Sequence, residues 1–118
     1  MKVAVSYSNG LVAKRFSETK EFKIYEIKRG KLINTYMLPC GELKGEELAP
    51  FLYDNNVDVV FCDCICKSLR RAIAKESIIF FPGVVGKADQ QVDAFIKGEL
   101  SFNSLINTGA YGAEEEQW

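Results

Sequence analysis

Hydrophobic and polar residues alternate along the first 40 positions, which is the pattern of β-strands with a buried face. Residues 2–8 form the first such run, and residues 22–28 and 31–38 form two more. Arg29-Gly30 joins the second run to the third. Two strand-like runs that flank a short glycine-containing turn predict an antiparallel hairpin.

After residue 45 the pattern changes to helices that alternate with short apolar strands. Apolar residues recur at helical spacing in three segments, and two apolar runs lie between these segments. The helical segments are 45–55, 68–76 and 88–97, and the apolar runs are 57–62 and 77–81. A hairpin followed by β-α-β-α units implies a mixed sheet covered by helices. We therefore expect an α/β protein with a three-layer, ribonuclease H-like fold. Its sheet should have about five strands in the order β-β-β-α-β-α-β-α, and the first strand should pair with both the hairpin and residues 57–62.

The end of the chain has weak periodicity and a different composition. Residues 101–118 contain two glycines and the acidic run Glu114-Glu115-Glu116. Such a segment does not bury enough apolar surface to fold by itself. The sequence predicts one domain over residues 1–100, followed by a flexible acidic tail over residues 101–118 that a partner could order.

Length and composition fit a single globular domain. The chain has 118 residues, of which 47% are hydrophobic and 26% charged, and a formal net charge of −1. This charge gives no bulk attraction to nucleic acid or to anionic membranes, and no apolar run approaches the roughly 20 residues that span a bilayer. The chain starts directly with a strand pattern rather than a signal peptide. We expect a cytoplasmic protein that binds neither nucleic acid nor membranes.

The sequence contains no histidine. This absence excludes Ser-His-Asp and Cys-His nucleophile systems, HExxH zinc sites and any imidazole acid–base role. No other nucleophile–base pair can be named. We therefore expect a protein that is not an enzyme.

The cysteines are the residues best suited to metal binding or redox chemistry. Three of the four, Cys62, Cys64 and Cys66, lie within five residues, and Cys40 follows the hairpin. The cluster falls where a central strand should end and the next helix should begin, and open α/β sheets bind ligands there. Soft thiolates select zinc, copper(I) or iron–sulfur clusters. If Cys40 reaches the same rim, four thiolates would complete a metal site.

Simpler interpretations of these residues remain open. Cys62, at the end of an apolar strand, could be a small core residue, and Cys64 and Cys66 could be incidental. Their C-x-C spacing differs from the C-x-x-C spacing of zinc and thioredoxin-like motifs. A disulfide across one residue would be strained, which disfavours a dithiol switch. Lys14 and Arg15 could hold an anionic cofactor or could belong to a solvated loop.

Several segments, in the same order, resemble the dinitrogenase iron–molybdenum cofactor-binding family over about residues 1–100. These segments are the opening Met1-Lys2-Val3-Ala4-Val5-Ser6, the motif Arg15-Phe16-Ser17, and residues 22–30, 56–62 and 86–100. The best-known members are nitrogenase cofactor carriers and the C-terminal domain of the cofactor-assembly enzyme. The resemblance implies a non-catalytic binding or carrier protein for an iron–sulfur or iron–molybdenum-type cluster.

The chain resembles a divergent member, because it lacks the family histidines. Members commonly carry histidine in the loop after the first strand and before the first helix, where this chain has Lys14-Arg15 and residues 40–45. The family's glycine-rich turn is replaced by residues 63–66. Histidine ligation therefore cannot carry over. The predicted metal ligands are Cys40, Cys62, Cys64 and Cys66, with Lys14 and Arg15 offsetting the charge of the cluster.

Two partner classes follow from these interpretations. A carrier would meet a cluster-assembly or acceptor protein. The alternative is a protein–protein interaction or scaffold module that has lost the cofactor site. In that case the segment from Glu114 to Trp118, which is acidic and ends in an aromatic residue, would be a docking segment.

Overall fold

The computed structural model describes residues 1–104 of the chain. In this part, one mixed sheet has the strand order β4-β3-β1-β5-β6, and the two-residue strand β2 pairs with β1 beside this path. The strands are β1 (Lys2–Ser8), β2 (Leu11–Val12), β3 (Glu21–Lys28), β4 (Lys31–Pro39), β5 (Val59–Phe61) and β6 (Ile79–Phe81). The α-helices are α1 (Leu48–Asp54), α2 (Lys67–Lys75) and α3 (Ala88–Ile96), and the 3₁₀ turns are η1 (Phe16–Glu18) and η2 (Gly45–Glu47).

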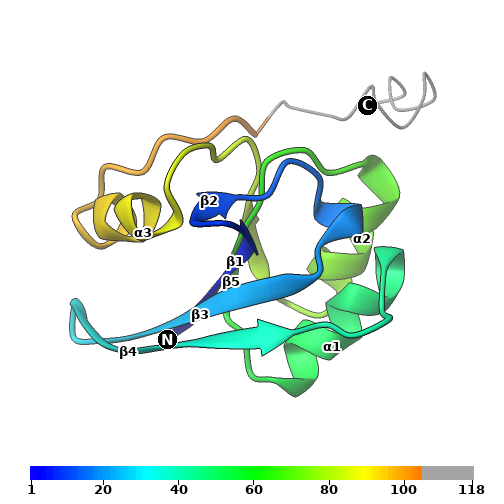
Figure 1. Ribbon diagram of the computed structural model, residues 1–118, viewed down its shortest axis with the longest axis horizontal. Helices are drawn as coiled ribbons and strands as arrows, with labels where there is room; N and C mark the ends of the chain where they lie inside the picture. Colours follow the sequence, from blue (N-terminus) through cyan, green and yellow to red (C-terminus); the bar gives the residue numbers. More distant parts are fainter. Residues whose placement is uncertain (105–118) are drawn as a thin grey trace.

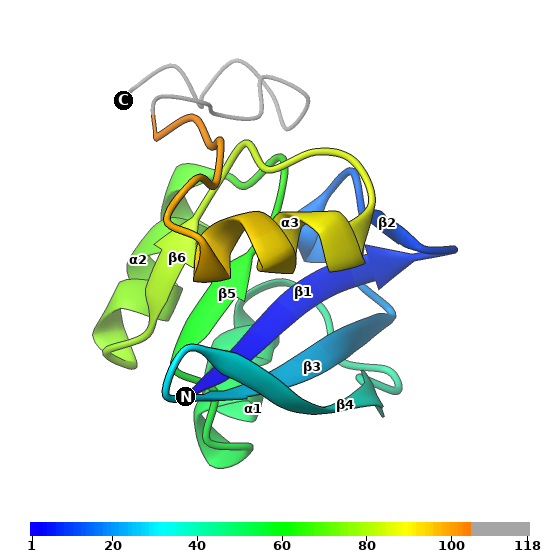
Figure 2. The ribbon, with the colours of Figure 1, turned by 90° about the vertical axis from the view of Figure 1, so that its left-hand side faces the viewer.

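Strand β1 is central, as the sequence predicts. It pairs antiparallel with β3 and parallel with β5, and β5 pairs parallel with β6. Helix α3 covers one face of the sheet, and α1 and α2 lie on the opposite side (Figures 1 and 2). The predicted three-layer α/β arrangement with a mixed sheet is therefore confirmed. The region expected to be a loop after β1 also contains β2 and η1.

Both faces of the central strands β1 and β5 are buried, and each face has its own apolar cluster. Alternate residues of β1 point to opposite faces, so that Ala4 packs towards α1 and α2, while Val3 and Val5 pack towards α3. The same alternation separates Val60 from Phe61 in β5. Two full layers of apolar side chains are buried against the sheet, which is the dominant favourable contribution to folding.

Pro50 lies inside the segment that the sequence assigns to the first helix. The structure places it at the third position of α1, directly after η2. Its missing N–H lies in the first turn, where no intrahelical acceptor is available, so the helix tolerates it. Leu48 and Leu52 remain buried on the face that packs against the sheet.

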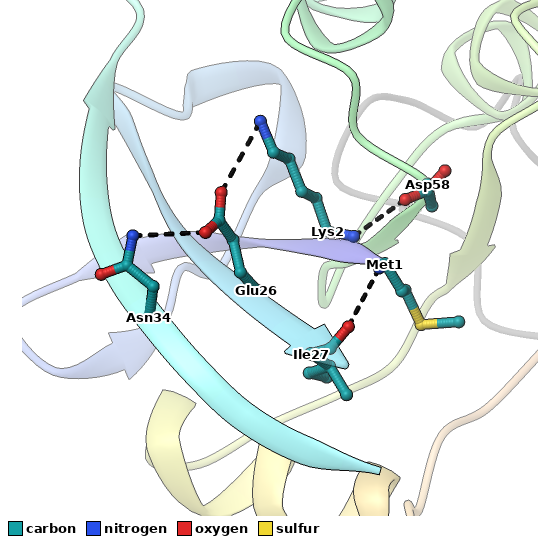
Figure 3. A network of polar contacts seen from close by, with 6 residues as sticks. All are labelled: Met1, Lys2, Glu26, Ile27, Asn34 and Asp58. Carbon is teal, nitrogen blue, oxygen red and sulfur yellow. Dashed lines mark hydrogen bonds and ion pairs between the residues drawn. The ribbon is translucent and has the colours of Figure 1, made fainter. Parts of the chain in front are cut away.

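A polar network ties the start of β1 to its neighbours (Figure 3). The terminal amine of Met1 donates to the Ile27 carbonyl at 3.0 Å, and the Lys2 N–H donates to Asp58 Oδ2 at 2.8 Å. The Lys2 side chain lies 3.8 Å from Glu26 Oε2. These contacts fix the amino end of β1 against β3 and the start of β5. Because β1 and β5 run parallel, their carboxyl ends emerge side by side at the opposite end of the strands.

The first residues of the predicted tail lie against the domain. The Phe102 ring is 4.9 Å from the Phe81 ring, and the Asn103 N–H donates to the Pro82 carbonyl at 2.9 Å. The rest of the predicted tail, including Glu114 to Trp118, lies outside the described residues. Within residues 1–104, no helix is long and apolar enough to cross a membrane.

Candidate functional site

The loop after β1 and the cysteine-containing loop after β5 pair through their backbones. The Cys64 N–H donates to the Lys14 carbonyl at 3.0 Å, and the Phe16 N–H donates to the Cys64 carbonyl at 2.9 Å. Arg15 and Cys64 thereby form an isolated parallel bridge. This pairing holds the two predicted cofactor-binding cations, Lys14 and Arg15, beside Cys64.

The loop after β6 pairs with the other side of the cysteine-containing loop. The Val84 N–H donates to the Cys62 carbonyl at 3.0 Å, and the Gly83 N–H donates to the Asp63 carbonyl at 2.9 Å. We call residues 13–16, 63–66 and 82–84 together the rim. The rim lies at the carboxyl ends of the parallel strands, at the top in Figure 1. Ligands of open α/β sheets bind at this edge.

The four predicted thiol ligands divide into two pairs by burial. Cys62 is fully buried and Cys40 is 4% exposed, and both belong to the apolar cluster beneath α1 and α2. Cys62 has the same parity as Val60, so its side chain points into this cluster. Cys64 and Cys66 are partly exposed at the rim. The interpretation of Cys62 as a small core residue agrees with this placement.

The predicted convergence of four thiols is not found. Among residues 1–104, which include every cysteine, no three Cys, Asp or Glu side chains are close enough together to hold a metal ion. Cys40 and Cys62 instead pack among apolar side chains. Metal binding by Cys64 and Cys66 stays a prediction.

Burial also sets the protonation of the thiols. Burial, with a smaller contribution from Glu21, raises the pKa of Cys40 to about 11. Burial likewise raises the pKa of Cys62. The pKa of Cys64 is raised by burial and by Asp63, while Lys14 and Arg15 act in the opposite direction. These three cysteines are therefore neutral thiols near pH 7, and metal binding by Cys64 would release a proton.

Cys66 occupies the N-cap position of α2, and its Sγ lies 3.4 Å from Ser68 Oγ. Helix α2 has no acidic residue in its first turn, and its composition is strongly basic. Its basic residues are Lys67, Arg70, Arg71 and Lys75. The partly exposed thiol of Cys66 therefore lies at the positive end of a basic helix, which favours an anionic ligand.

Two adjoining clefts lie along the loop that contains η1, and the first of them borders the rim. One, of about 310 Å³, is lined by Lys14 and Arg15 together with residues 7–9 and 18–21. The other, of about 460 Å³, is lined by residues 17–20 and 41–44. No cysteine lines either cleft. Lys14 and Arg15 therefore lie between the first cleft and Cys64.

Buried hydroxyl groups hold the wall that the clefts share. Thr19 Oγ1 donates to the Phe16 carbonyl at 2.6 Å and lies 2.7 Å from Ser6 Oγ. The sequence interpretation did not include Thr19 or the residues at the end of β1, Tyr7 to Asn9, in the site. Their signal was available, because the carboxyl end of a central strand is where a ligand is expected.

Comparison with known proteins places this geometry in a family. The family described as dinitrogenase iron-molybdenum cofactor matches residues 1–98. The crystal structure of PH0822 has a TM-score of 0.83 and 21% identity, and covers 89% of this chain and 96% of its own. A candidate dinitrogenase from Methanocaldococcus jannaschii has a TM-score of 0.71 and 25% identity, with 88% and 95% covered. The apo form of the orange protein from Desulfovibrio gigas has a TM-score of 0.74 and 18% identity, with 87% and 92% covered. No curated protein matches the chain.

Proposed function

Because the chain belongs to the dinitrogenase iron-molybdenum cofactor family, we propose that it carries an anionic iron–sulfur or iron–molybdenum-type cluster as cargo, without catalysis. One observation carries this proposal. Backbone pairing holds two cations, Lys14 and Arg15, next to the partly exposed thiol of Cys64. Thiolates are the preferred protein ligands of iron–sulfur clusters, and the cations would offset the cluster's negative charge.

The proposal assigns the cargo to the rim rather than to all four cysteines. Cys64 and Cys66 are partly exposed, whereas Cys40 and Cys62 would have to leave the core to reach a ligand. Two protein thiolates do not complete the four-thiolate shell of a permanently held cluster. The remaining positions would stay with the cluster's own ligands or pass to an acceptor protein, which suits transfer.

Reconstitution without oxygen tests this assignment. Purified protein incubated with iron, sulfide and a reductant should bind iron and show thiolate-to-iron absorption. A Cys64→Ser, Cys66→Ser double variant should lose both signals. The matched control, Cys40→Ala with Cys62→Ala, should retain iron for as long as it remains folded by circular dichroism. Equal iron content in the Cys64→Ser, Cys66→Ser variant and the wild type would reject the assignment.

A second candidate function is a scaffold or interaction module that has lost the cofactor site. The absence of a three-ligand group among residues 1–104 favours it. Binding to an assembly or acceptor protein that survives replacement of all four cysteines, but fails on deletion of residues 105–118, would support this alternative. Binding that depends on reconstituted iron would support the carrier.

A further inference from the structure

Strand β4 is an open edge of the sheet. It is nine residues long, and in residues 1–104 it pairs on one side only, with β3 (Figure 2). From residue 32 to residue 39 it has no charged side chain. Proteins usually protect a long edge strand with charges, bulges or a covering element, because its free backbone groups can pair with another strand. The strand carries one such bulge, at Ile33, and its pairing with β3 is regular from Asn34 to Pro39.

Apolar side chains on β4 face solvent as well. Leu32, Ile33 and Met37 are 47%, 60% and 39% exposed. Tyr36 and Leu38 are partly buried against the cluster beneath α1 and α2. An exposed strand edge with apolar side chains is typical of an interaction site.

We propose that β4 pairs antiparallel with β4 of a second copy of this chain, which joins the two sheets into one. A two-fold axis near Thr35 would place Ile33 opposite Met37 of the second copy. The axis makes two such apolar pairs across the seam, and cross-strand pairs of this kind stabilise a sheet. The interface is isologous, as in most homodimers.

The charges at the two ends of β4 favour this occupant and this direction. The hairpin tip, residues 28–31, has three basic residues and no acidic one. The segment after β4, residues 40–47, has three glutamates and one lysine. Antiparallel pairing brings the basic tip of each copy beside the acidic segment of the other. Parallel pairing would instead bring the two basic tips together.

This inference is independent of the carrier function. The rim lies at the carboxyl ends of β1, β5 and β6, while β4 is separated from β1 by β3. Iron binding by a monomer would leave the dimer proposal refuted and the carrier proposal intact. A dimer that binds no iron would do the reverse.

Sedimentation velocity of the full chain, from micromolar to near-millimolar concentration, tests the proposal. The wild type should form dimers, and more weakly at high salt because the end contacts are charged. Ile33→Lys should raise the dimer dissociation constant about tenfold or more, since the two-fold axis repeats each lost contact. Met37→Lys should have a similar effect. Ile79→Lys is the matched control, because Ile79 is also 60% exposed but lies in β6, at the opposite edge.

Circular dichroism and urea unfolding should show that all three lysine variants are folded, since each replaces an exposed side chain. Monomers of the wild type throughout this concentration range would overturn the proposal. Dimers of Ile33→Lys and Met37→Lys as tight as those of the wild type would also overturn it. Equal weakening by Ile79→Lys would place the interface elsewhere and would equally refute it.

Discussion

Replacing Cys62 with serine tests whether this cysteine belongs to the core or to the ligand site. Its side chain is fully buried, and its backbone groups are already paired with Phe81 and Val84. A serine hydroxyl there would be placed among apolar side chains and would lose its hydrogen bonds to water. We expect a loss of about 1–3 kcal/mol in the free energy of unfolding. The same change at the partly exposed Cys64 should cost no more than about 0.5 kcal/mol.

Urea denaturation without oxygen and with a reductant, followed by circular dichroism, measures both values. For a domain of this size, a loss of about 2 kcal/mol corresponds to a fall of roughly 10 °C in the melting temperature. Cys62→Ala separates polarity from volume, because it leaves a small cavity without an added hydroxyl. Equal stability of Cys62→Ser and the wild type, or a larger loss in Cys64→Ser, would refute the division of the cysteines into core and rim.

Three further predictions concern the described part of the chain. Tyr25→Phe removes the 2.6 Å hydrogen bond to Asp89 and should cost about 1 kcal/mol near pH 7. This hydrogen bond lowers the pKa of Asp89. The stabilisation is therefore present above the ordinary carboxyl pKa of about 4 and should fade as the pH falls below it, which unfolding at several pH values will show. Gly83→Ala would place Cβ 2.7 Å from Asn103 Cβ, so it should lower the melting temperature more than Gly41→Ala, which meets no atom within 4 Å. In native protein, iodoacetamide should modify the two rim cysteines well before the two buried ones, and mass spectrometry of peptides will show the order.

The sequence predicts the fold well because its signals are local. Alternation in residues 2–8 and helical spacing in residues 88–97 require only neighbouring residues, and both elements occur where they are expected. The run of residues 57–62 is longer than β5, and at its end the Cys62 carbonyl accepts from the Val84 N–H in the loop after β6. The ends of elements depend on partners that are distant in sequence.

The candidate site was only partly predictable for the same reason. The proximity of Lys14 and Cys64 comes from backbone pairing across fifty residues, and neither loop carries a local signal for it. The burial of Cys62 follows from its parity with Val60, so it could have been predicted by extending the strand by one residue. The burial of Cys40 depends on its N–H, which donates to the Lys20 carbonyl at 3.0 Å and holds it against the core.

The most direct test of the carrier proposal compares two double variants that remove the same charge. Lys14→Ala with Arg15→Ala alters the rim, while Lys28→Ala with Arg29→Ala alters the distant hairpin tip. Equilibrium dialysis of protein reconstituted with iron and sulfide, against a competing chelator, measures how firmly each holds the cluster. We expect the rim variant to lose its iron at a chelator concentration about tenfold lower than the wild type does. The tip variant should behave like the wild type. Equal retention by both variants, or equal loss, would contradict the assignment of the cargo to the rim.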